Sequence, residues 1–210
     1  NIGSTQAKGL EFELHSLNIK SGDFQWNTDF NFSYTIYRWK TRNPELVLNS
    51  WQSVTDEMSA VFGWETDGIF HSYDEIYAYK NSKGELLQPK AVPGNIKYKD
   101  YNGDGVLDDK DNHFLGRTSA PFRFGFNNTF TYKRFSATMY WYGAAGFLAV
   151  SPGNRGTAMG GNAQHNTYDN GIDKIWSMKN PNGTWPGIGS DLTSSTQRTG
   201  GPSDFWYKKI

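Results

Sequence analysis

The sequence predicts an all-β fold of antiparallel strands, of the kind that crosses a membrane as a segment of a transmembrane β-barrel. Aromatic residues make up 16% of the 210 residues, yet the mean hydropathy is only -0.70. Apolar and polar residues alternate over runs of about ten residues, which is the length of a strand that crosses a bilayer. Very short connections between strands alternate with very long ones, as in membrane barrels.

The first pair of strands is expected at residues 10–20 and 24–34, joined by a tight turn at residues 21–23. In the second of these strands, one face is mainly aromatic: Phe24, Trp26, Thr28, Phe30, Phe32 and Tyr34. The other face is polar: Gln25, Asn27, Asp29, Asn31 and Ser33. Alternation of this length is a strong signal for a strand.

The first strand of this pair breaks its own pattern near the turn. Leu17 and Ile19 fall out of phase with the apolar residues that precede them. One extra residue in the strand would restore the phase, so we predict a β-bulge near His15 or Ser16.

The second pair of strands is expected at residues 122–132 and 135–147, joined around Lys133 and Arg134. The rest of the chain is expected to form long outer loops at residues 35–121 and 148–204. Soluble strands are usually shorter than these, so their length favours a membrane-crossing sheet over a sandwich core or an exposed sugar-binding platform.

In this interpretation the aromatic face contacts lipid and the polar face lines a wet lumen. Four aromatic residues are expected near the membrane interfaces, where such side chains gather: Trp26, Tyr34, Tyr132 and Trp141. Five polar residues are predicted to face the lumen: Gln25, Asn27, Asp29, Arg123 and Asn127.

Residues 100–111 have the residue spacing of an EF-hand calcium loop, with Gly105 at the sharply turning sixth position. The side-chain oxygens come from Asp100, Asn102, Asp104, Asp108 and Asp111, and Val106 would add its backbone carbonyl. A structural Ca²⁺ that pins the loop is predicted. The alternative is a turn stabilised by its own Asp and Asn side chains.

Other functional classes find little support in the sequence. The chain has no cysteine and equal numbers of acidic and basic residues, 21 of each, so neither a thiolate site nor a nucleic-acid surface is indicated. Its four histidines are scattered and form no zinc-binding pair. No nucleophile motif or acid pair stands out, so an enzyme is not predicted. Four loop aromatics could contact a ligand or partner, or could anchor their own loops: Trp64, Tyr73, Trp176 and Trp185.

Several motifs resemble those of a known family. Residues 94–108 resemble the GDIKYKDxNGDGxID signature of SusC/RagA-type TonB-linked outer-membrane transporters. Residues 121–130 resemble the strand that follows it, and residues 7–11 and 63–70 resemble earlier motifs. Residues 175–186 and 203–206 resemble later ones. The matches occur in the family's order and cover nearly the whole chain, with Asn95 replacing a common Asp.

The resemblance implies the C-terminal part of a plugged barrel of about 22 strands. It further implies nutrient import across the outer membrane of a Bacteroidetes-type Gram-negative bacterium, energised by TonB through a plug outside this chain. A SusD-like surface lipoprotein would be the partner, and a glycan or peptide the substrate. Both ends of the sequence look cut, so a fragment of a longer protein is expected. The alternative is a secreted, calcium-stabilised, carbohydrate-binding β-sandwich.

Overall fold

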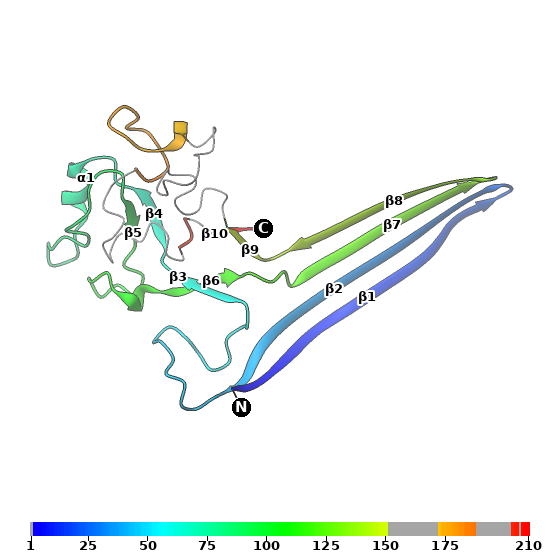
Figure 1. The fold of residues 1–210 in the computed structure, drawn as a ribbon, viewed down its shortest axis with the longest axis horizontal. Helices are drawn as coiled ribbons and strands as arrows, with labels where there is room; N and C mark the ends of the chain where they lie inside the picture. Colours follow the sequence, from blue (N-terminus) through cyan, green and yellow to red (C-terminus); the bar gives the residue numbers. More distant parts are fainter. Residues whose placement is uncertain (1, 151–171, 188–202, 206) are drawn as a thin grey trace, which may run out of the picture.

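The computed structural model describes residues 2–150, 172–187, 203–205 and 207–210. Most of the range 148–204, predicted to be an outer loop, therefore lies outside the described residues. In Figure 1 a long, narrow sheet projects from a head made of short elements. This division follows the sequence, because the alternating runs form the sheet and the described segments between and after them form the head.

The long sheet has four antiparallel strands in the order β1-β2-β7-β8. Its strands are β1 (Gly3–Ser21), β2 (Phe24–Arg42), β7 (Phe122–Tyr132) and β8 (Phe135–Ala145). All four expected strands are therefore confirmed. β1 and β2 run further than predicted, whereas β8 ends two residues earlier, just before Gly146 adopts a φ of 81°.

Both hairpins turn within two residues at the far end of the sheet (Figure 1). Gly22 and Lys133 each open their turn with a φ of 55°, a left-handed conformation that glycine adopts freely and lysine does not. The Lys133 amide donates a hydrogen bond to the Asp23 carbonyl, 3.0 Å away, so the two turns lie side by side.

The β-bulge predicted in β1 is present, but later in the strand than predicted. The register shift lies between Leu17 and Ile19, not near His15 or Ser16. As a result Ile19 pairs with Trp26 and returns to the aromatic face, whereas Leu17 pairs with Asn27 and stays on the polar face. The bulge thus places Asn18 outside the regular pairing, where its side chain can reach across to β2.

β1 and β2 continue past the outer ends of β7 and β8. The Thr35 amide still donates to the carbonyl of Pro121, but beyond it β2 pairs on that side with residues 56–58. Nineteen residues at about 3.3 Å each span roughly 60 Å, twice the hydrocarbon thickness of a bilayer. The outer part of this hairpin therefore belongs with the head.

The described part of the head contains short paired strands, one short α-helix and two single turns of 3-10 helix. Its strand pairs are β3 (Ala60–Gly63) with β6 (His113–Arg117), β4 (Thr66–Ile69) with β5 (Ile96–Tyr98), and β9 (Leu148–Val150) with β10 (Tyr207–Lys209). The helical elements are α1 (Tyr73–Ala78), η1 (Asp109–Asp111) and η2 (Ile172–Lys174). Two small cores hold the head together, one around Ile69, Ile96 and Tyr98 and the other around Phe70 and Ile76.

The sheet does not form one layer of a sandwich in the described part of the chain. Its aromatic face stays open, since Phe12, Phe124 and Trp141 keep 51%, 42% and 63% of their surface exposed. The sandwich alternative, in which this face is a buried core, is therefore wrong for the described residues. None of the described helices has the length and apolar character needed to cross a membrane.

Candidate functional site

All four strands of the long sheet contribute to the aromatic face, which is mainly apolar. Register places Phe30 beside Phe126, and Phe126 beside Trp141. The Trp26 and Phe130 rings stack with centroids 5.5 Å apart. β1 adds Leu10, Phe12 and Leu14, which are about half exposed. A monomer in water rarely exposes an apolar surface of this extent, so the face fits contact with lipid.

A row of polar side chains interrupts the aromatic face close to the turns. Asn18 donates to Thr28 Oγ1 at 2.5 Å, and Thr28 donates to Asn128 Oδ1 at 2.8 Å. The Trp26 indole N–H reaches the same Asn128 oxygen at 2.9 Å. Thr28 and Asn128 are buried. The polar groups of this row form hydrogen bonds with one another, which an apolar environment requires.

The opposite face gathers the five residues predicted to line a lumen. Alternation places Gln25, Asn27 and Asp29 on one face of β2, and register puts Arg123 and Asn127 on the same face of β7. The Asp29 carboxylate contacts His15 Nδ1 at 2.9 Å and accepts from Asn127 Nδ2 at 3.1 Å. A shared polar face is therefore observed, and its role as a lumen wall remains a prediction.

The predicted calcium loop lies in the head between β5 and β6. Each of its first three ligand candidates accepts a backbone hydrogen bond. Asp100 accepts from Gly103 and Gly105, both at 2.7 Å, and Asn102 accepts from the Asp104 amide at 2.8 Å. Asp104 in turn accepts from Val106 at 2.9 Å. Gly105 has a φ of 85°, the left-handed turn for which glycine was predicted.

Asp111 closes the loop from its twelfth position and is fully buried. Its carboxylate accepts from the amides of Tyr101, Asn102 and Asp108. Burial raises the pKa of Asp111 above its ordinary value, and the charge of Asp100 acts in the same direction. The carboxylates of the loop are thus organised by backbone amides, and within the described residues no group of three or more acidic or histidine side chains is arranged to hold a metal ion.

Three of the four loop aromatics anchor the head. Trp64 and Trp176 pack against the core around Ile96, and the Trp64 and Tyr98 rings lie 5.4 Å apart. Trp185 lies under the Lys174 ammonium, 5.5 Å from its ring centroid. Tyr73 differs, because it stays 53% exposed on α1 and stacks on Tyr77, which is exposed as well.

An ion cluster that sequence reasoning missed ties the head to the long hairpin. The Glu57 side chain is 5% exposed and accepts two hydrogen bonds from Arg117, at 2.6 and 2.9 Å. Arg38, on the outer part of β2, donates a third at 2.8 Å. The three residues are far apart in the chain and have ordinary surface character in the sequence, so no local pattern marks them.

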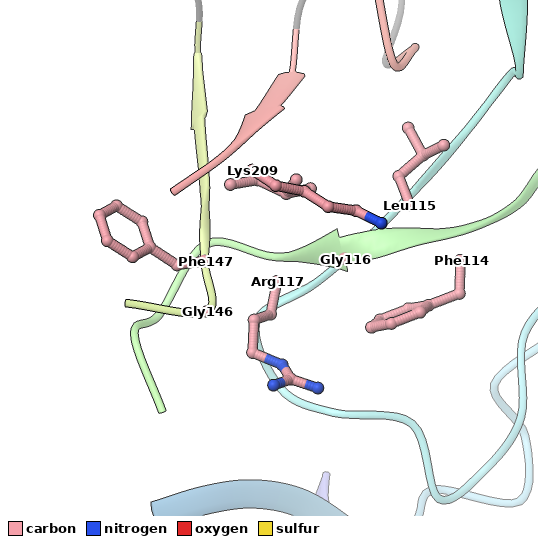
Figure 2. Close-up of a pocket in the computed structure, with 8 residues that line it drawn as sticks. Phe114, Leu115, Gly116, Arg117, Gly146, Phe147 and Lys209 are labelled. Atoms are coloured by element: carbon pink, nitrogen blue, oxygen red, sulfur yellow. The ribbon is translucent and has the colours of Figure 1, made fainter. Parts of the chain in front are cut away.

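A pocket of about 270 Å³ lies where the head meets the outer end of the sheet. Figure 2 shows Lys209 reaching across it toward Leu115 while Arg117 points to the other side of β6. Phe114, Phe147 and Leu148 make the walls mainly apolar. The described lining contains no carboxylate and no histidine.

The chain is similar in sequence to TonB-dependent receptors. No protein-family model matches the chain. Over 155 residues, 70% of the chain, it is 28% identical to TonB-dependent receptor P3 of Formosa agariphila. In an alignment 213 residues long, which covers 93% of the chain, it is 27% identical to TonB-dependent receptor P26 of the same bacterium. The chain spans only 15% and 20% of the lengths of these two receptors.

The fold matches solved structures of the RagAB peptide transporter over the whole chain. The TM-score is 0.64 at 16% identity, and the match covers 22% of that transporter chain. A second RagAB structure, in a closed-closed state, gives a TM-score of 0.62.

Fold and faces together define a segment of an antiparallel, all-β membrane barrel. The chain is similar in sequence to TonB-dependent receptors and shares its fold with part of the RagAB transporter, which supports the resemblance to the SusC/RagA type drawn from its motifs. These relatives are receptors and transporters, in keeping with the absence of an enzyme motif in the sequence.

Proposed function

We propose that this chain is part of the barrel wall of a transporter that imports a nutrient across the outer membrane in a TonB-dependent manner. The observation that carries the proposal is the two-faced long sheet. Its β7 and β8 are eleven residues long, which suits one bilayer crossing, and its tight turns lie opposite the folded head.

The physical role of the segment follows from its two faces. Unpaired backbone groups cannot face lipid, so the free edges of β1 and β8 require further strands of the same barrel. The aromatic face would then hold the wall in the bilayer, and the polar face would line the path of the substrate. The segment performs no covalent chemistry in this proposal.

The partners and the cellular location belong to the proposal as well. TonB would act through a plug outside this chain, a SusD-like surface lipoprotein would work with the head, and the substrate would be a glycan or a peptide. The outer membrane of a Bacteroidetes-type bacterium is the proposed location. The relatedness to TonB-dependent receptors and the RagAB-like fold support these assignments.

The proposal is tested in cells that carry the intact protein. Its gene is deleted and restored, and uptake of labelled oligosaccharides and peptides is measured with and without TonB. We expect the protein in the outer-membrane fraction and uptake that needs both the protein and TonB. A protein that stays soluble after lysis, or uptake unchanged by its deletion, would refute the proposal.

The Asp100–Asp111 loop is proposed to hold a structural Ca²⁺. Its all-oxygen donor set suits this cation, and the accepted amide bonds leave further lone pairs on each carboxylate. The burial of Asp111 next to Asp100, without an ion-pair partner among the described residues, also favours a bound cation. When bound, Ca²⁺ would supply neutralising charge and pin the loop between β5 and β6.

Calorimetry on the intact protein tests calcium binding at this loop. We expect Asp104→Ala to remove the binding heat, because it deletes a ligand at the fifth position. Asp109→Ala is the matched control, since Asp109 is exposed in the same loop at a position that supplies no ligand. Equal binding in both variants, or no binding by the parent, would leave the self-bonded turn as the correct description.

A further inference from the structure

Four uncharged residues form a patch on the polar face of the long sheet. Register places Asn127 on β7 beside Tyr140 on β8. One row further from the turns, Asn31 on β2 and Tyr142 on β8 flank Gly125. The two tyrosines are the main exception to the small polar residues of this face of β8, and they keep 67% and 74% of their surface exposed.

Gly125 shapes the centre of this patch. A Cβ at this position would lie 2.9 Å from both terminal atoms of the Asn31 amide. The Asn31 side chain therefore lies over the glycine, from β2 toward β8, and occupies space that any other residue would take. The glycine thus leaves room for the Asn31 amide on the β2 side, and Tyr142 pairs with it on the β8 side.

The patch has unused capacity for hydrogen bonds. Asn127 donates through Nδ2 to Asp29, but its Oδ1 has no donor within the described residues. The Asn31 amide and the hydroxyls of Tyr140 and Tyr142 likewise form no hydrogen bond in the described part of the chain. The patch therefore offers several neutral donors and acceptors beside two open aromatic rings.

The charged side chain next to the patch, Asp29, already has hydrogen-bond partners. Asp29, which adjoins Asn127, is held by His15 on one oxygen and by Asn127 on the other. The nearest other charges lie outside it, Glu13 beyond Asn31 on β1 and Arg123 two residues from Gly125. A ligand that depends on ion pairing would therefore find its partners at the margins, whereas a neutral polar ligand fits the centre.

We infer that Tyr140, Tyr142, Asn31 and Asn127 form a subsite for a neutral sugar ring on the wall of the import path. A pyranose presents an apolar C–H face that packs on an aromatic ring, and hydroxyls around its edge that exchange hydrogen bonds with amides. The inference rests on the proposed function, because it requires that the polar face line the path of the substrate.

Binding of neutral oligosaccharides to the intact protein tests this subsite. The protein is purified in a detergent without a sugar head group and titrated with maltohexaose, laminarihexaose and mannohexaose up to about 10 mM. We expect binding of at least one of them. Tyr142→Ala and Asn31→Ala should each weaken it about 2- to 12-fold, the range of one ring contact or one hydrogen bond. Tyr142→Phe keeps the ring and should retain most of the affinity, and Arg123→Gln should change little.

Several results would overturn the subsite. The first is that the parent binds no oligosaccharide, and the second is that the alanine variants leave binding unchanged. The third is that those variants have lower thermal stability but unchanged binding, which would show that the rings pack on another part of the protein. Peptide binding that depends on Arg123 would overturn it as well. TonB-dependent uptake measured alongside separates the two claims, since uptake unaffected by Tyr142→Ala removes the subsite and leaves the import function standing.

Discussion

Replacing Glu57 with glutamine tests how the head is fixed to the long hairpin. The parent carboxylate accepts three short hydrogen bonds from two arginines and is almost fully buried. Loss of one member of a buried ion cluster costs about 3–5 kcal/mol. Arg38 keeps 48% and Arg117 21% of its side chain exposed, so water can partly replace the lost partner. We therefore expect a loss of about 2–3 kcal/mol in the local opening free energy.

Hydrogen exchange on the intact protein, read on peptides that cover β3 and β6, measures this loss. A decrease of about 2–3 kcal/mol should speed exchange there about 30- to 150-fold, because these strands open without unfolding the barrel. Asp67→Asn, read on peptides that cover β4 and β5, is the matched control, since the Asp67–Lys97 pair is similarly short at 2.7 Å but its carboxylate is 57% exposed. That variant should change exchange by about fivefold at most. Equal effects of the two variants would refute the reasoning that burial makes the Glu57 cluster strong.

Three further predictions concern single side chains. Lys133→Gly should stabilise the second hairpin turn by about 1 kcal/mol in denaturant unfolding, because φ is 55° there. Gly22→Ala should destabilise the first turn by a similar amount, although its Cβ would meet nothing within 4 Å. Destabilisation by Lys133→Gly or stabilisation by Gly22→Ala would contradict the assignment of strain. Burial raises the pKa of Tyr79 to about 12, so the head should lose stability as pH rises from about 10 to 12. Tyr79→Phe should abolish this pH dependence of stability, measured by hydrogen exchange. An alkaline stability profile that the variant leaves unchanged would contradict the role of Tyr79. Gly94→Ala should loosen the packing of Trp176 and lower local stability by about 2–3 kcal/mol, because the new Cβ would lie 2.6 Å from that indole at a φ of 92°. Tryptophan fluorescence and hydrogen exchange that stay unaltered would contradict this prediction.

The sheet could be predicted from sequence because each strand carries its own signal. Alternation from Phe24 to Tyr34 fixes which side chains share a face, and the same holds for Phe122 to Tyr132. The bulge was predicted at the wrong residue because the phase break spans several positions, and pairing with β2 decides which of them leaves the ladder. At its actual place Asn18 reaches Thr28, a contact that the sequence of one strand does not reveal.

The head was harder to predict because its elements are short and its contacts are distant in sequence. Strands of three to five residues such as β5 and β6 carry too few residues for a periodic pattern. Glu57 reaches Arg117 across sixty positions. The calcium-type loop, in contrast, was visible because all its oxygen donors lie within twelve residues. The patch around Gly125 required the register of three strands, which no local pattern supplies.

The central claim, that aromatic side chains of the sheet face lipid while their polar neighbours face water, is tested most directly by spin labels on β2. This chain contains no cysteine, so single cysteines can be introduced at Phe30, Asn31, Phe32 and Ser33 of the intact protein in bilayers. Labels at positions 30 and 32 should be accessible to oxygen, and labels at 31 and 33 to a water-soluble nickel reagent. Accessibility that does not alternate, or that alternates in the opposite sense, would contradict the account.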